Sequence, residues 1–200
     1  MEDTYQTIVA PSEGLYKEKG SKFIALAYPV YSEEEVKELL AELRKQYYDA
    51  RHHCYAYILG AGKSRYRAND DGEPNHSAGD PILGQIRSAD LSNVLVVVVR
   101  YFGGTKLGVS GLINAYKTAA ADALAHATLI EKYETALLQV YFAYPQMNEV
   151  MSLVKTYSLE IKEQLFELDC RLTLEVRKKL LEEVTARLEE MEAVTVLEQV

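Results

Sequence analysis

Residues 93–112 read NVLVVVVRYFGGTKLGVSGL, and this stretch decides the fold of the chain around it. The six apolar, mostly β-branched residues from Val94 to Val99 predict a short strand that is buried on both faces. A cationic, glycine-rich loop follows the strand. Beyond the loop, apolar and small residues recur every three or four positions and predict a helix with a small-residue packing face. That face is formed by Leu112, Ala115, Tyr116, Ala119, Ala120 and Ala123.

The loop between this strand and helix is a candidate anion site. A helix N-terminus offers free backbone N–H groups, and basic side chains beside it favour a negatively charged ligand. The loop is not a mononucleotide-binding P-loop, because Val109 stands where that motif needs lysine, and at Gly62-Lys63-Ser64 the first glycine is replaced by Tyr57. No Gly-x-Gly-x-x-Gly fingerprint for a dinucleotide is present either. The structural alternative is that the glycines serve tight turns and close helix–strand contact.

Composition indicates a globular protein with two domains. The chain has 200 residues, 48% of them hydrophobic, and a net charge of −8. All 11 glycines lie at or before Gly111, which places a domain boundary near residues 128–134. We therefore expect one domain over residues 1–130 and a second over residues 134–200. Two distant cysteines and the lack of a signal peptide or membrane-spanning run predict a cytoplasmic protein with reduced thiols.

Charge is distributed unevenly along the chain. Residues 131–200 carry 14 acidic and 8 basic side chains, whereas residues 51–117 carry 5 acidic and 8 basic ones, interleaved with tyrosines. A basic island with aromatic residues is compatible with a local polyanion site. The overall negative charge argues against a protein that coats DNA generally.

Secondary-structure signals order the rest of the N-terminal region. Residues 4–10 and 21–30 are predicted strands separated by a turn around Gly14. A capping box at Ser32–Glu35 opens a helix, and a strand follows from Cys54. We expect residues 61–84 to form a long polar loop.

This polar loop contains the acidic candidates Asp70, Asp71, Glu73, His76 and Asp80. Their atom types suit a metal, but their spacing fits neither an EF-hand nor a zinc site, and turn formation is the favoured interpretation. We therefore predict no metal site and no other cofactor.

The C-terminal region alternates strands and helices in the order βαββαβ, which predicts a ferredoxin-like domain. The predicted strands are residues 134–144, 159–166, 170–176 and 194–200, with helices starting at Pro145 and Arg177.

Four blocks of the sequence resemble the signature blocks of the YigZ/IMPACT family. The blocks are Arg51–Tyr57, Asn69–Pro74, Ala78–Leu83 and Val97–Gly108. Two positions depart from the family pattern: Asn75-His76-Ser77 replaces a small Ser-Gly-Thr segment, and Ser110-Gly111 replaces a Gly-Gly pair. Serine is a good helix N-cap, so the second change preserves the helix start.

The resemblance implies an α+β architecture. Its N-terminal α/β domain would be of the ribosomal protein S5 domain 2-like type, similar to domain IV of elongation factor G, and a ferredoxin-like domain would follow. It also implies nucleic-acid or ribosome association for bacterial members. Eukaryotic relatives regulate translation under amino-acid starvation through an extra N-terminal domain that is not found in these 200 residues.

We therefore predict a non-enzymatic accessory protein that binds RNA or the ribosome through the basic loop. The predicted contact residues are Arg51, His52, His53, Arg100, Tyr101, Phe102, Gly103, Gly104 and Lys106. One alternative is an enzyme for a small phosphorylated or carboxylated substrate that uses the acidic loop, with or without a metal. The other is a protein-interaction scaffold in which the acidic second domain docks a basic partner.

Overall fold

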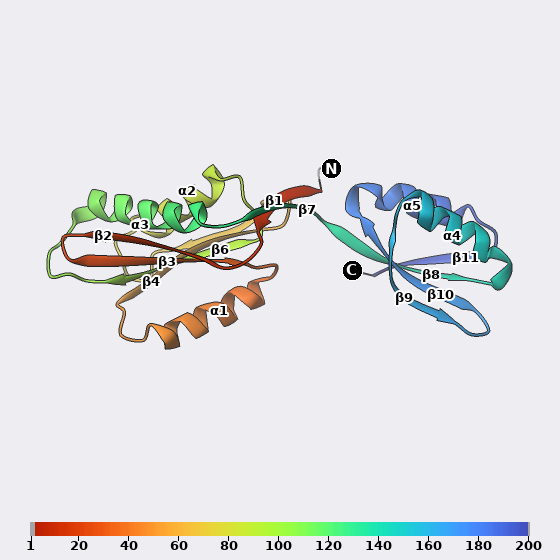
Figure 1. Cartoon of the computed structure of the whole chain (residues 1–200), viewed down its shortest axis with the longest axis horizontal. Helices are drawn as coiled ribbons and strands as arrows, with labels where there is room; N and C mark the ends of the chain where they lie inside the picture. Colours follow the sequence, from red (N-terminus) through yellow and green to blue (C-terminus); the bar gives the residue numbers. More distant parts are fainter. Residues whose placement is uncertain (1–2, 200) are drawn as a thin grey trace. The chain divides into compact units, whose positions relative to one another are not determined.

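The computed structural model describes residues 3–199, which divide into two compact units (Figure 1). The N-terminal unit comprises residues 5–132, and the C-terminal unit comprises residues 133–199 together with Asp3 and Thr4. Each unit has its own hydrophobic core. None of the helices within residues 3–199 is long and apolar enough to cross a membrane.

A five-stranded antiparallel sheet forms the centre of the N-terminal unit, in the order β2-β3-β6-β4-β5. The strands are β2 (Ser12–Glu18), β3 (Ser21–Pro29), β4 (His52–Leu59), β5 (Arg65–Asn69) and β6 (Val94–Tyr101). Figure 1 shows two helices, α2 and α3, on one face and a third, α1, on the other. They are α1 (Glu33–Gln46), α2 (Gly79–Ser88) and α3 (Gly108–Ala125). A separate two-stranded sheet pairs β1 (Thr4–Ile8) with β7 (Leu129–Tyr133).

Strand β6 is the central strand of the sheet, and both of its faces are buried as predicted. Val94, Val96 and Val98 pack in the core beneath α2 and α3. Leu95, Val97 and Val99 pack in the opposite core against α1. A strand between two helical layers has no solvated face, which is why its sequence is uniformly apolar instead of alternating.

Helix α3 buries its small-residue face against the sheet, as its spacing predicts. Its small side chains let strand β2 approach the helix closely. A Cβ atom added at Gly14 would lie 2.2 Å from the backbone nitrogen of Ala123. The prediction of a turn at Gly14 is therefore wrong, because this glycine lies within β2 and is required for strand–helix contact.

The prediction that residues 61–84 form one loop is also wrong, since β5 and the start of α2 lie within it. Strand β5 is an exposed edge strand with the sequence RYRAN, so it shows no apolar alternation. Helix α2 begins at Gly79 without a side-chain cap on its own N-cap residue, Ala78. Both elements lack the local signals from which strands and helices are predicted.

The C-terminal unit has the predicted ferredoxin-like fold. Its four-stranded antiparallel sheet has the order β11-β8-β10-β9. Its elements are β8 (Thr135–Phe142), η1 (Tyr144–Gln146), α4 (Met147–Thr156), β9 (Glu160–Phe166), β10 (Cys170–Arg177), η2 (Lys178–Leu180), α5 (Leu181–Glu189) and β11 (Val194–Gln199). One face of the sheet packs with α4 and α5 around Leu138, Leu172 and Leu174.

Replacing Gly14 with alanine should destabilise the N-terminal unit. The new methyl group would meet the α3 backbone, which a side-chain rotation cannot relieve, and overpacking of this kind costs about 1–3 kcal/mol or more. We expect a clearly lower midpoint of thermal unfolding for Gly14→Ala.

Gly84→Ala is the matched control, because a Cβ at this helical position would meet no atom within 4 Å beyond its chain neighbours and the backbone of its own helix. Alanine favours a helix over glycine by about 1 kcal/mol, so this variant should unfold at an equal or higher temperature. Equal loss of stability in both variants would contradict the close approach at Gly14.

Candidate functional site

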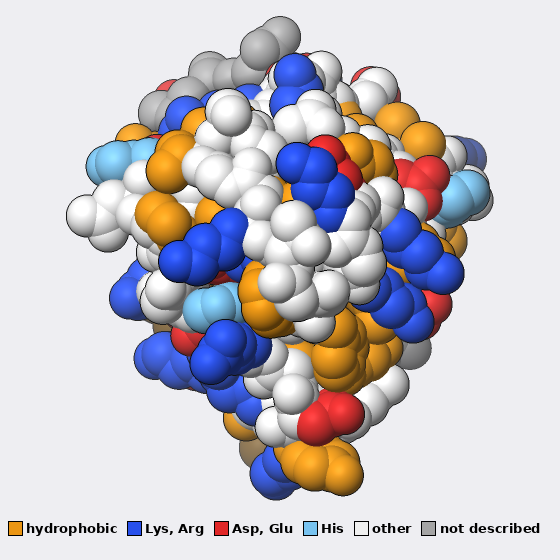
Figure 2. All heavy atoms as spheres, turned by 90° about the vertical axis from the view of Figure 1, so that its left-hand side faces the viewer, with side chains coloured by type: hydrophobic (Ala, Val, Ile, Leu, Met, Phe, Trp, Pro, Cys, Tyr) orange, Lys and Arg blue, Asp and Glu red, His pale blue; other side chains and the backbone are white. Residues whose placement is uncertain are grey.

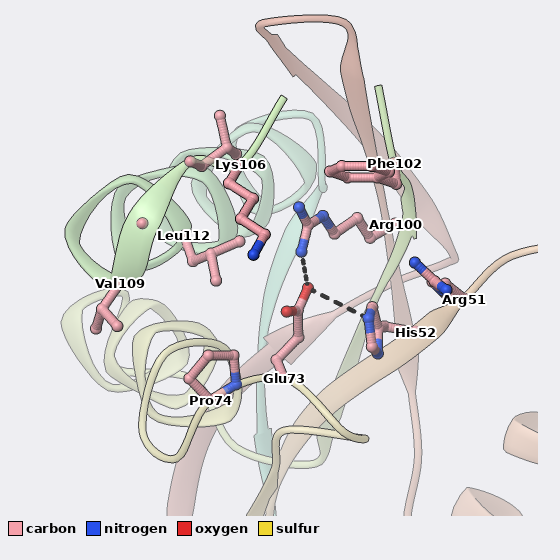
Figure 3. A pocket seen from close by; sticks show the side chains of 11 residues that line it. Arg51, His52, Glu73, Pro74, Arg100, Phe102, Lys106, Val109 and Leu112 are labelled. Carbon is pink, nitrogen blue, oxygen red and sulfur yellow. Dashed lines mark hydrogen bonds and ion pairs between the residues drawn. The ribbon is translucent and has the colours of Figure 1, made fainter. Parts of the chain in front are cut away.

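A pocket of about 390 Å³ opens at the end of the sheet where β4 begins and β6 ends (Figure 3). It is lined by residues of both groups that the sequence predicts as candidates, the basic loop and the acidic loop. Its lining residues are Arg51, His52, Glu73, Pro74, Arg100, Phe102, Lys106, Leu107, Gly108, Val109 and Leu112. Three cationic side chains therefore surround one carboxylate.

The floor of the pocket contains a buried ion pair between Arg100 and Glu73. The Arg100 Nη1 atom donates to Glu73 Oε1 at 2.5 Å, and the two side chains are only 8% and 4% exposed. The Tyr116 hydroxyl donates to the same oxygen at 2.7 Å. Two donors therefore hold one oxygen of the carboxylate in place. Periodicity alone assigns Tyr116 to the core, although a buried tyrosine hydroxyl needs a hydrogen-bond partner.

His52 forms one wall of the pocket and lies beside Arg100 across the β4–β6 pair. Its Nδ1 atom is 2.8 Å from the carbonyl oxygen of Asp71, which can only accept a hydrogen bond. The neutral ring therefore carries its proton on Nδ1. Its Nε2 atom faces Glu73 Oε1 at 3.9 Å.

Cys54 lies beneath this cluster and is fully buried. Its thiol donates to the carbonyl oxygen of Asp70 at 3.0 Å, and its sulfur lies 3.4 Å from the Tyr116 hydroxyl oxygen. Burial raises the pKa of the Cys54 thiol far above its ordinary value. This cysteine is therefore a structural residue and a poor nucleophile.

The rim of the pocket is cationic and aromatic. The side chains of Arg51 and Lys106 are exposed and form no hydrogen bond or ion pair with any part of the chain that the structure describes. Phe102 is 44% exposed, and its ring centroid lies 5.6 Å from the Arg100 guanidinium carbon. Figure 2 shows Lys and Arg side chains spread over the face that includes this end of the N-terminal unit, among few acidic ones.

Helix α3 starts at the pocket and adds backbone donors to it. Gly108 and Val109 of its first turn line the cavity, and no side chain caps this end. The first N–H groups of a helix have no partner within the helix, and they carry partial positive charge. The first turn of α3 has no acidic residue that would offset that charge.

Four of the residues predicted to contact RNA lie outside the pocket. Tyr101 donates its hydroxyl to Asp49 at 2.9 Å, and His53 is buried with Nε2 3.1 Å from the Tyr47 carbonyl oxygen. A Cβ atom on Gly103 would lie 1.9 Å from the carbonyl carbon of Gly20, so this glycine permits close backbone contact. The remaining one, Gly104, has a φ of +92° with open space around it.

The acidic loop divides between structural and pocket-facing roles. Asp70 accepts hydrogen bonds from the backbone N–H groups of His76, Ala78 and Gly79. It therefore caps α2 although it lies outside the helix in the sequence. Asp71 pairs with Arg44 through both carboxylate oxygens.

On the surface, His76 Nδ1 lies 2.5 Å from Asp80 Oδ2. Of the five acidic-loop candidates, all of them among the residues that the structure describes, only Glu73 lines the pocket. Within residues 3–199, no three His, Cys, Asp or Glu side chains are grouped so that they could hold a metal ion.

Two groups behind the pocket have shifted pKa values. Burial, aided by the charge of Arg44, lowers the pKa of His53 below its ordinary 6.5. Burial alone would raise the pKa of Asp71, but hydrogen bonds from Arg44 and the His53 N–H outweigh it and hold the pKa below 3.8. His53 is therefore neutral, and Asp71 charged, at neutral pH.

Because folded His53 resists protonation, the protein should lose stability as the pH falls below about 6.5, where the unfolded chain takes up a proton that the folded chain does not. We expect the thermal midpoint to fall between about pH 7 and about pH 5, and to fall less in His53→Gln. The contribution of Asp71 to the free energy of unfolding is lost only below about pH 3.8, so the pH ranges in which His53 and Asp71 affect stability are separate.

His76→Gln is the control, since it removes an imidazole that is 82% exposed. It should keep the acid-side loss of stability seen in the unmodified protein. Identical pH profiles for the unmodified protein and His53→Gln would contradict a buried neutral His53.

Comparison with known proteins agrees with the resemblance. Residues 19–124 match the family model of the Impact N-terminal domain. The IMPACT family member YvyE of Bacillus subtilis (strain 168) is 32% identical over 160 residues, which cover 80% of this chain and 74% of that protein. The IMPACT family member YigZ of Escherichia coli (strain K12) is 33% identical over 147 residues, covering 72% of each.

A solved crystal structure, described as that of a hypothetical protein, covers 100% of this chain and 99% of its own with a TM-score of 0.74 and 25% identity. The family model spans the pocket and every residue that lines it. This chain is a member of the IMPACT family.

Proposed function

We propose that this protein is a non-enzymatic accessory protein of translation that binds RNA, free or on the ribosome, in the cytoplasm. The observation that carries the proposal is the pocket at the start of α3, where free cationic side chains, helix N–H groups and an exposed aromatic ring lie together. Phosphate groups suit the cationic side chains and the helix N–H groups, and an unstacked base suits the aromatic ring.

The structure changes which residues are assigned to the phosphates. Arg100 is buried and paired with Glu73, so its charge is largely engaged within the protein. Arg51 and Lys106 lie on either side of it at the rim and have no partner among residues 3–199. We therefore assign phosphate contact to Arg51, Lys106 and the first turn of α3. Arg100 fixes the shape of the pocket between them.

A second candidate function is catalysis on a small phosphorylated or carboxylated molecule. The observation that favours it is that His52 and Glu73, both of types used in acid–base catalysis, lie in the same pocket. We rank this candidate second because the shared oxygen of Glu73 is already engaged by Arg100 and Tyr116.

RNA binding should be strongly sensitive to salt and should weaken in the double variant Arg51→Ala/Lys106→Ala. Each phosphate contact to single-stranded RNA contributes about 0.7 to the slope of log K against log salt concentration, so two lost contacts should lower the slope by about 1.4. The measurement is fluorescence anisotropy with labelled single-stranded RNA across a salt series, together with ribosome co-sedimentation.

The matched control is Lys37→Ala/Arg65→Ala, which removes the same charge from exposed positions on α1 and β5. It should leave both affinity and slope close to those of the unmodified protein. An undetectable affinity at low salt would refute the proposed function, and an equal loss in both double variants would refute the assignment to the pocket.

A further inference from the structure

Glu73 has a second carboxylate oxygen that faces the pocket. Every hydrogen bond and ion pair of its side chain goes to Oε1. Oε2 has no hydrogen-bond partner among the described residues. It is also not one of the polar atoms that are buried without a partner, so it is not sealed from solvent. In Figure 3 this oxygen points toward the side of the cavity where Leu112 and Lys106 lie. A ligand in the pocket would therefore meet a fixed hydrogen-bond acceptor.

The groups around this acceptor are donors, which sets the polarity of a matching ligand. The Lys106 ammonium group points into the cavity in Figure 3, and the free N–H groups of α3 lie on the same side. The Arg100 Nε atom is sealed from the cavity, so it is not among the donors that a ligand would meet. A well-matched ligand carries an anionic group and, separately, a hydrogen-bond donor.

The remaining walls are apolar and suit a flat ring. Pro74, Val109 and Leu112 line the cavity, and the Phe102 ring stands at its rim. The volume of about 390 Å³ lies within the range of small-molecule pockets and leaves room for a single nucleotide. The pocket thus offers an apolar slot, a stacking face, an acceptor at the floor and cations at the rim.

We infer that this pocket takes one unstacked nucleotide whose base donates an exocyclic amino group to Glu73 Oε2 while its phosphate lies against Lys106, Arg51 and the start of α3. The inference rests on the proposed function and adds base selectivity to it. Carboxylates accept from the N4 amino group of cytosine. Uracil offers only N3–H on that edge, between two carbonyl oxygens that a carboxylate repels. Glu73 is therefore the specificity-determining residue, and cytosine is bound in preference to uracil.

The test compares labelled oligocytidylate and oligouridylate of equal length, together with free CMP and UMP. A good base contact of this kind discriminates by about tenfold or more, so we expect oligocytidylate to bind about tenfold tighter than oligouridylate. Glu73→Gln should reduce that ratio to about twofold or less, because an amide can present either its donor or its acceptor. The salt slope, which reports phosphate contacts, should not fall in this variant.

Two controls separate base recognition from loss of structure. Glu38→Gln makes the same acid-to-amide change at an exposed position on α1, outside the pocket, so it should keep the preference for cytosine. Oligomers of N4,N4-dimethylcytidine lack the amino donor and should bind the unmodified protein no better than oligouridylate. This second control needs no protein variant and holds even where Glu73→Gln fails to fold.

The outcomes distinguish base recognition from RNA binding. Equal binding of both oligomers to the unmodified protein would overturn base recognition and leave RNA binding standing. Binding of CMP over UMP without binding of either oligomer would support the nucleotide pocket and overturn the proposed RNA function. A preference for cytosine that survives in a folded Glu73→Gln variant would refute the assignment to Glu73.

Discussion

The charge of Arg100 constrains the rest of the N-terminal unit. It is the last buried residue of β6, a strand with a core on either side, and an unpaired charge at such a position would cost several kcal/mol. Glu73 supplies the opposite charge from the β5–α2 loop. The ion pair need not add net stability, because both groups lose their hydration. What it does is fix where that loop must lie, and with it the wall of the pocket.

Much of the fold was predictable because its signals are local. The apolar run of β6, the alanine-rich face of α3 and the Ser32 cap of α1, which receives the Glu35 N–H, are each encoded within one element. The βαββαβ order of the C-terminal unit follows from periodicity in the same way. The errors came where the stabilising contact is not local. Gly14 is explained only by its contact with Ala123 of α3, far along the chain, and α2 is capped by Asp70 from outside the helix.

The residue types in the candidate site could be predicted, but the pairs that they form could not. Sequence patterns separated Arg100, in a basic loop, from Glu73, in an acidic one, because the two lie 27 positions apart. Their pairing depends on the β5–α2 loop folding back over the end of β6. The role of Tyr116 could not be predicted for the same reason, because its partner is distant in the sequence and periodicity alone assigns it to the core. A buried hydroxyl among alanines was the signal that could have indicated a polar partner nearby.

The acidity of the whole chain shapes how such a pocket could meet RNA. A net charge of −8 repels a polyanion at long range, so the protein gains little from electrostatic steering. At physiological salt the Debye length is only about 8 Å, and acidic residues farther away are screened. Contact would then depend on a few short-range groups at one end of the sheet. A carboxylate at the centre of that cationic cluster weakens general attraction to phosphate, which is the expected cost where a site selects among anions instead of binding all of them.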